Sequence, residues 1–254
     1  MAAFLFVPTG MRAQDSSSQQ QQPPATQQTT PQTPPTTMQE QPSKNEQQQR
    51  ALILREAQAR VNARRQERIR QIIKDTYSHK YDVYFGGDYL RFLPGASLQH
   101  MNETGWNAGL VDYLHGKFGV AADFRGYYGT AYTGLHLNGV NEAYSPSISQ
   151  YTFLAGPQYR LFEGQHWGWA AQVLAGAGHG NFATGTGGLG SAPVGLWNDG
   201  TVLNVSAGVS VDYNLSPALA LHLAPNALFT DYGSTFQHNL GFNIGVLYRF
   251  GRQH

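Results

Sequence analysis

Few residue patterns in the sequence could do chemistry. Residues 185–190 have the sequence GTGGLG and match the GxGxxG motif, whose glycines let a backbone approach a phosphate where a strand leads into a helix. Here the motif is followed by Ser191-Ala192-Pro193, which opens no helix. The spacing therefore predicts a loop and no nucleotide site.

A hydrolase would need a serine nucleophile activated by a histidine base. Two short-range pairs contain these residue types, namely His100 with Ser97 and His238 with Ser234. Neither pair has an acidic residue at a position that would orient the histidine. The nine histidines show no metal-ligand spacing and cysteine is absent. We therefore expect no catalytic residue, no cofactor and no metal.

Most of the chain alternates between two kinds of residue. Along 203–214 every second residue from Leu203 is apolar or Tyr, and the others are Asn, Ser, Gly or Asp. Along 240–250 apolar residues occupy every second position from Leu240, while Arg249 lies on the other face. A period of two is that of a β-strand with a different environment on each face. Eight segments fit this period, at about 81–93, 104–115, 117–129, 149–162, 166–179, 203–214, 219–229 and 240–250.

Connection lengths separate a membrane barrel from a soluble sandwich or lipocalin. Long connections at 94–103, 130–148, 180–200 and 231–238 alternate with tight turns at 115–117, 163–165 and 216–217. Long loops on one side and tight turns on the other are typical of bacterial outer-membrane barrels, which also have an even number of strands. The sequence thus predicts an all-β, eight-stranded antiparallel up-and-down transmembrane barrel.

Charged residues are expected to line the lumen of this barrel. A Lys or Arg that faces hydrocarbon at the bilayer midplane costs about 2–4 kcal/mol, so these residues belong inside, paired with one another. Arg91 and Asp112 fall on the outward face and must lie at strand ends. The predicted lumen polar network consists of Asp82, Asp88, Asp123, Arg125, Arg160, Asp212, His222 and Arg249.

Composition supports the membrane barrel. Charged residues make up only 13% of the chain, whereas Gly, Tyr and Phe number 29, 14 and 13. No run of about 18 apolar residues exists, which excludes a spanning helix. Aromatic residues fall near strand ends, where membrane girdles lie. They are Tyr81, Trp167, Trp169, Tyr213, Tyr248 and Phe250 at the turn end, and Tyr89, Trp106, Phe229 and Tyr232 at the loop end.

Residues 79–250 resemble the OmpA-like family of outer-membrane β-barrel domains. The resemblance is carried by the first strand, 84–89 (YFGGDY), the Gly-containing strand 203–213 and the closing segment 245–250 (GVLYRF). It implies that Tyr248 and Phe250 act as the aromatic signal that the barrel-assembly machinery recognises. The closing Phe is followed by residues 251–254, which departs from the family pattern.

The region before the barrel has a different composition. We expect residues 1–14 to be the remnant of a secretory signal, with a disordered terminus as the alternative, and residues 15–46 to be a disordered Gln/Pro/Thr-rich linker. Residues 47–78 predict a helix. Residues 44–80 hold ten Lys/Arg against four acids, while 81–254 hold six against ten. This basic helix is either a solvated spacer or a contact with an anionic surface such as the inner leaflet or the cell wall.

The sequence therefore predicts a structural or interaction protein of the bacterial outer membrane that is not an enzyme. Its expected partners are outer-membrane lipids and the assembly machinery, with no nucleic acid, and its N-terminal arm lies in the periplasm. A lipid-modifying hydrolase and a narrow channel are the alternatives. Recovery without detergent would instead indicate a soluble lipocalin-like binder.

Overall fold

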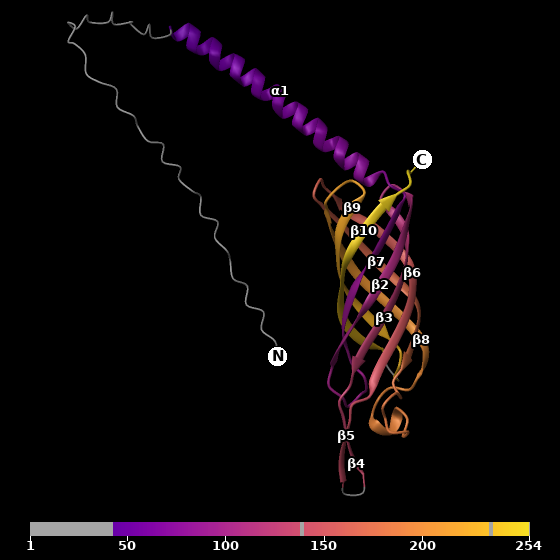
Figure 1. Cartoon of the computed structure of the whole chain (residues 1–254). Helices are drawn as coiled ribbons and strands as arrows, with labels where there is room; N and C mark the ends of the chain where they lie inside the picture. The colour runs from indigo at the N-terminus through magenta and orange to yellow at the C-terminus, as the bar shows by residue number, and fades with distance from the viewer. Residues whose placement is uncertain (1–42, 138–139, 234–235, 254) are drawn as a thin grey trace, which may run out of the picture. The chain divides into compact units, whose positions relative to one another are not determined.

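A computed structural model describes residues 43–137, 140–233 and 236–253 (Figure 1). The predicted signal remnant and most of the predicted linker lie outside these residues. The described part of the chain begins with one helix, α1 (Lys44–Tyr77), which starts slightly earlier than the predicted residue 47. In the part of the chain that the structure describes, no helix is both long and apolar enough to cross a membrane.

Eight strands form a closed antiparallel barrel, so the predicted fold class is confirmed. Each strand pairs with its sequence neighbour, and the first pairs with the last, with Tyr81 opposite Phe250. The barrel strands are β1 (Tyr81–Phe92), β2 (Met101–His115), β3 (Phe118–Thr130), β6 (Ser147–Glu163), β7 (Trp167–Asn181), β8 (Gly200–Asn214), β9 (Leu219–Thr230) and β10 (Gln237–Phe250).

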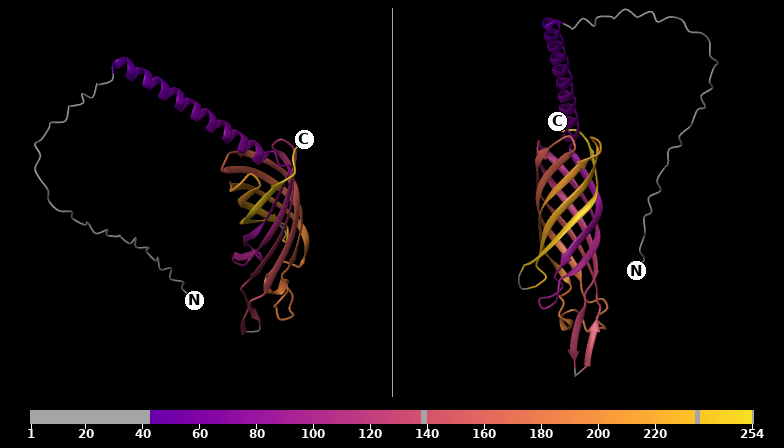
Figure 2. Two further views of the ribbon diagram at one scale, coloured as in Figure 1. Left: turned by 45° about the horizontal axis from the view of Figure 1, so that its top comes forward. Right: turned by 90° about the vertical axis from the view of Figure 1, so that its left-hand side faces the viewer.

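Tight turns gather at one end of the barrel and long loops at the other, as the connection lengths predict (Figure 2). The turn between β2 and β3 uses Gly116 at φ 54°, a left-handed conformation that glycine adopts without a steric cost. The loop between β3 and β6 contains a hairpin that the sequence analysis did not predict. Its strands are β4 (Thr133–Leu137) and β5 (Val140–Tyr144).

The interior and exterior faces follow the predicted alternation. In β9, for example, Leu219, Leu221 and Leu223 are exposed on the outside, while Ala220 and His222 are buried inside. Such alternation lets one wall face hydrocarbon and a polar interior at the same time.

The two outward-facing charges lie near strand ends, as required. Arg91 is the penultimate residue of β1, and Asp112 lies near the end of β2. Asp112 forms an ion pair with Lys80 at 3.8 Å, which offsets part of the cost of a charge near the apolar wall.

An apolar layer fills the loop end of the lumen. Phe92, Phe182 and Tyr232 contact one another there, with ring centroids 5.0–6.2 Å apart. The prediction that Tyr232 belongs to the outer aromatic girdle is therefore wrong. Tyr232 follows the end of β9, where the chain leaves the strand period, and its ring turns inward and is only 7% exposed.

Candidate functional site in the polar lumen

All eight residues of the predicted lumen polar network are buried inside the barrel. The structure divides them into two groups. The mid-lumen network contains Asp88, Asp123 and Arg125, and the turn-end network contains the other five, Asp82, Arg160, Asp212, His222 and Arg249. Stacking of Tyr84 on His222, with centroids 4.7 Å apart, connects the two groups.

Arg125 is the centre of the mid-lumen network. Its side chain is fully buried, and its Nε and Nη2 donate to the two carboxylate oxygens of Asp123 at 2.9 and 3.3 Å. Its Nη1 donates to Asn226 Oδ1 at 3.0 Å, and Asp88 Oδ2 lies 3.9 Å from Nε. One buried cation therefore faces two carboxylates. Asp123 also accepts a hydrogen bond from the hydroxyl of Tyr84, and Asp88 accepts one from the hydroxyl of Tyr127.

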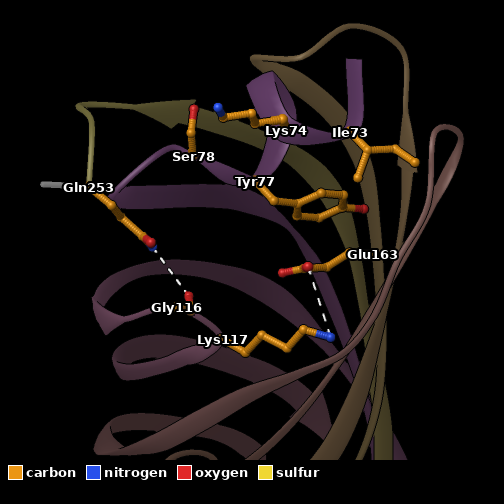
Figure 3. A pocket seen from close by; sticks show the side chains of 8 residues that line it. All are labelled: Ile73, Lys74, Tyr77, Ser78, Gly116, Lys117, Glu163 and Gln253. Carbon is orange, nitrogen blue, oxygen red and sulfur yellow. Dashed lines mark hydrogen bonds and ion pairs between the residues drawn. The ribbon is translucent and has the colours of Figure 1, made fainter. Parts of the chain in front are cut away.

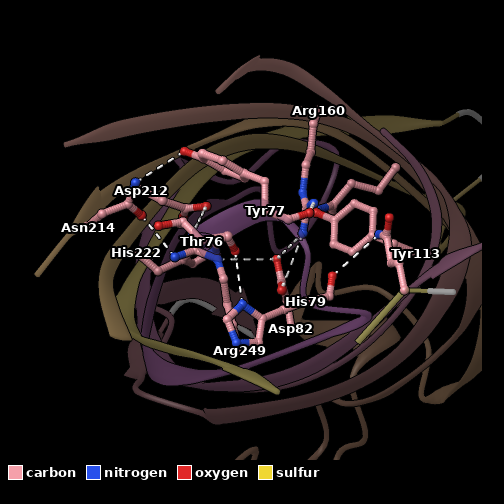
Figure 4. Close-up of polar contacts among 12 residues, drawn as sticks. Thr76, Tyr77, His79, Asp82, Tyr113, Arg160, Asp212, Asn214, His222 and Arg249 are labelled. Carbon is pink, nitrogen blue, oxygen red and sulfur yellow. Dashed lines mark hydrogen bonds and ion pairs between the residues drawn. The ribbon is translucent and has the colours of Figure 1, made fainter. Parts of the chain in front are cut away.

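Two arginines and two aspartates form the core of the turn-end network (Figure 4). Arg249 lies 3.8 Å from Asp82 and 3.5 Å from Asp212. Arg160 pairs with Asp82 at 3.3 Å, and its guanidinium carbon lies 3.4 Å from the ring centroid of Tyr113. His222 Nδ1 and Asp212 Oδ1 are 2.6 Å apart. Polar and charged side chains from five strands thus cross-link the barrel wall.

The end of α1 contacts this network. Arg160 Nη1 donates to the carbonyl of Tyr77 at 3.1 Å, and Asn214 Nδ2 donates to the Tyr77 hydroxyl at 3.1 Å. The hydroxyl also lies 3.2 Å from the carbonyl oxygen of Gly164 in the β6–β7 turn. Burial raises the pKa of Tyr77. The last residue of α1 is therefore part of the turn end of the barrel.

A pocket of about 390 Å³ lies beside Tyr77 (Figure 3). Lys74 from α1 and Lys117 from the β2–β3 turn line it, and Lys117 pairs with Glu163 at 3.9 Å. Gln253 donates to the carbonyl oxygen of Gly116 at 3.3 Å. These contacts hold together the helix end, two turns and the segment after β10.

Sequence reasoning missed several members of the lumen. Three of them are buried tyrosines. Tyr113 accepts a hydrogen bond from Gln158 and lies against the guanidinium of Arg160, whereas Tyr84 and Tyr127 donate to the carboxylates of Asp123 and Asp88. Their position on the same face as the charges was the available signal. Glu103 is completely buried and accepts from Gln150 at 2.9 and 3.0 Å. The second strand was predicted to begin at 104, so Glu103 was counted as loop.

Several buried polar atoms have no hydrogen-bond partner among the residues that the structure describes. They include Asp88 Oδ1, Thr152 Oγ1, Ser206 Oγ and both side-chain polar atoms of Asn204 and Asn243. A buried polar group without a hydrogen bond costs about 1–3 kcal/mol, and bound water normally supplies the missing bond. The middle of the lumen is therefore chemically suited to internal water.

Among the described residues, the candidate catalytic patterns are not assembled into a site. Four glycines of 185–190 have positive φ, and the motif leads into only a three-residue 3-10 helix, η1 (Ala192–Val194). Ser97 and His100 are both exposed and share no hydrogen bond, and Ser234 lies outside the described residues. Among the residues placed by the structure, no group of three His, Asp or Glu could hold a metal.

No protein-family model matches the sequence, and no curated protein matches it. Solved structures similar in fold include Ail from Yersinia pestis, at 16% identity and a TM-score of 0.43 over 68% of this chain and 99% of that one. Neisserial surface protein A matches at 15% identity and a TM-score of 0.46 over 67% and 97%. The outer membrane protein OprG from Pseudomonas aeruginosa matches at 12% identity and a TM-score of 0.45, over 68% of this chain and 97% of that one. The structure of this chain is itself a closed barrel of eight antiparallel strands.

Proposed function

We propose that the protein spans the bacterial outer membrane as a structural or interaction barrel without catalytic activity. The observation that carries this proposal is the contrast between the two faces of one wall. The outside exposes large apolar side chains, whereas the inside buries ion pairs. A soluble protein rarely exposes so large an apolar surface. Members of the exposed surface include Phe85, Leu110, Phe153, Val173, Leu221, Ile244 and Val246.

Aromatic residues support a membrane boundary at each end of this surface. Trp167, Trp169 and Tyr248 are exposed near the turn end. Near the loop end, Tyr128 and Tyr151 share a hydrogen bond between their hydroxyls on the outside. Rings with one polar edge favour the interface between hydrocarbon and water. The long loops then lie outside the cell, and the tight turns lie in the periplasm.

The lumen favours a closed barrel over a channel. Eight strands leave room for little more than side chains, and here three arginines with their carboxylate partners cross the interior. The Phe92, Phe182 and Tyr232 layer adds an apolar barrier at the loop end. We therefore expect no ion conductance.

The periplasmic arm is the second part of the proposal. Nearly every side chain of α1 from Lys44 to Arg68 is exposed, and its only ion pair in the described structure joins Glu56 to Arg60 at 3.9 Å in solvent. The other exposed guanidinium groups of α1 can contact an anionic surface, which is the cell wall or the inner leaflet. The alternative is that α1 is a solvated spacer. We further propose that the barrel-assembly machinery recognises the exposed side chains of Tyr248 and Phe250.

The first experiment compares boiled and unboiled samples of the full chain refolded in detergent micelles. A barrel migrates differently before and after boiling, so we expect a heat-modifiable band. Proteolysis of whole cells should cut only within 93–100, 131–146, 182–199 and 231–236, and planar bilayers should show no current steps. A species that stays soluble without detergent would contradict the membrane proposal, and regular current steps would indicate the channel.

A further inference from the structure

A second pocket, of about 380 Å³, opens at the loop end of the barrel. Its volume lies within the roughly 300–1,000 Å³ of small-molecule sites. Asn102 and Thr130 are exposed on the outer side of β2 and β3, and not in the lumen. The complete lining is Gln99, His100, Met101, Asn102, Thr130 and Tyr132.

The lining has the chemistry of a sugar site. Its amide and hydroxyl groups can both donate and accept hydrogen bonds, which suits the hydroxyls of a saccharide. Tyr132 is 82% exposed, so its apolar ring face is open to the C–H face of a sugar ring. No aspartate or glutamate of the described segments lines the pocket, so an anionic ligand meets no repulsion from this lining.

Arg91 adds a positive charge beside the pocket. It is directly opposite Asn102 in the pairing of β1 with β2, and neighbouring side chains at such positions are about 4.5–5.5 Å apart at Cβ. Arg91 is exposed on the outer face, and no carboxylate of the described chain pairs with it. Its guanidinium can therefore form a bidentate contact with a phosphate.

The wall below Arg91 is apolar. Arg91 pairs with Leu240 of β10, which is 63% exposed. Tyr89 donates its hydroxyl to Asn102 at 2.7 Å, and its ring centroid lies 5.3 Å from that of Phe242. Along this wall a polar pocket lining, a cation and an apolar surface follow one another.

We propose that this surface binds a glycolipid of the outer leaflet. The saccharide occupies the pocket against Tyr132, a phosphate on the saccharide pairs with Arg91, and an acyl chain lies on Leu240 and Phe242. This inference rests on the proposed location, because only the outer leaflet places a phosphorylated saccharide at the loop end. Continuity of the pocket with the apolar wall favours a lipid over a soluble sugar.

The test uses the full chain refolded in micelles and native mass spectrometry to count bound glycolipid. The probes are deep-rough lipopolysaccharide, its dephosphorylated form, phosphatidylglycerol, and the phosphorylated disaccharide without acyl chains. Loss of one charge-assisted hydrogen bond weakens binding about tenfold or more. We expect Arg91→Gln and Tyr132→Ala each to weaken lipopolysaccharide binding about tenfold. The control Arg252→Gln, an exposed arginine at the turn end, leaves it unchanged.

The dephosphorylated form should bind the unmodified chain about tenfold more weakly and should not respond to Arg91→Gln. Three results would overturn the inference. The first is that both variants bind lipopolysaccharide as well as the unmodified chain does. The second and third are that the unmodified chain binds phosphatidylglycerol, or the disaccharide without acyl chains, as well as it binds lipopolysaccharide. The heat-modifiable band is scored in the same samples. A folded band without glycolipid preference rejects this site alone, whereas absence of the band rejects the proposed membrane barrel as well.

Discussion

Replacing Arg125 with methionine should strongly lower the free energy of unfolding of the barrel. The change keeps an unbranched apolar stem but removes the guanidinium, which among the described residues is the only cation that contacts both Asp88 and Asp123. The side chains of all three residues are completely buried. Two carboxylates would then remain in a low-dielectric interior without a positive partner.

The magnitude follows from that burial. Removing one partner of a buried ion pair costs about 3–5 kcal/mol, because the other charge is left uncompensated. Neutral replacement of all partners is often harmless, so the triple variant with Arg125→Met, Asp88→Asn and Asp123→Asn should recover most of the loss. The control Arg252→Met changes an exposed arginine and should stay within about 0.5 kcal/mol.

The assay is urea unfolding in phospholipid vesicles, with the folded fraction read from the heat-modifiable band. Each variant is measured at equilibrium against the unmodified chain, so that the free energies can be compared directly. A cost below about 1 kcal/mol for Arg125→Met would mean that water already screens these charges. A triple variant no better than the single one would show that the loss comes from packing, and either result refutes the electrostatic argument.

Three further changes test other parts of the structure. Gly86→Ala would place a Cβ against the backbone oxygen of Ile244 in β10 and should cost about 1–3 kcal/mol in urea unfolding. Gly87→Ala, whose new Cβ would have its nearest neighbour 3.9 Å away, should cost far less. Burial raises the pKa of Tyr77, so its contribution to stability persists up to the ordinary tyrosine pKa of about 10 and falls as the pH rises further. In the variant Tyr77→Phe, the urea midpoint should not show this decrease at alkaline pH. Alanine at both Tyr248 and Phe250 should leave refolding in detergent intact but reduce the heat-modifiable fraction in cell membranes; equal fractions would exclude an assembly signal.

The sequence predicts the wall of this barrel well because inside and outside alternate with a period that local sequence carries. Asp212 and His222 were placed on the inner face from neighbouring residues alone, and both are buried there. Pairing across the lumen is different. Arg125 bonds to Asn226, 101 positions away, and no local pattern encodes which inward residues meet.

The ends of the strands are where prediction was weakest. Glu103 and Tyr232 lie at the loop end, where hydrogen-bonded pairing extends beyond the clear alternation or the chain leaves it. The sequence analysis predicts only a loop at 130–148, although the dipeptide Asn138-Gly139 in this region favours two-residue hairpin turns. Tyr77 was assigned only to a helix, because contacts between a helix end and a lumen depend on tertiary structure.

Closure of the seam between β1 and β10 joins Tyr81 to Phe250, 169 positions apart (250 − 81). Contacts so distant in sequence form slowly, because a long chain must first be brought together. Asp82 and Arg249 stand on the two seam strands, so their charges stay hydrated in every open intermediate and enter the low-dielectric interior only when the seam closes. Reopening must separate these charges inside the lumen. The barrel is thereby held shut by a kinetic barrier as well as by its equilibrium stability.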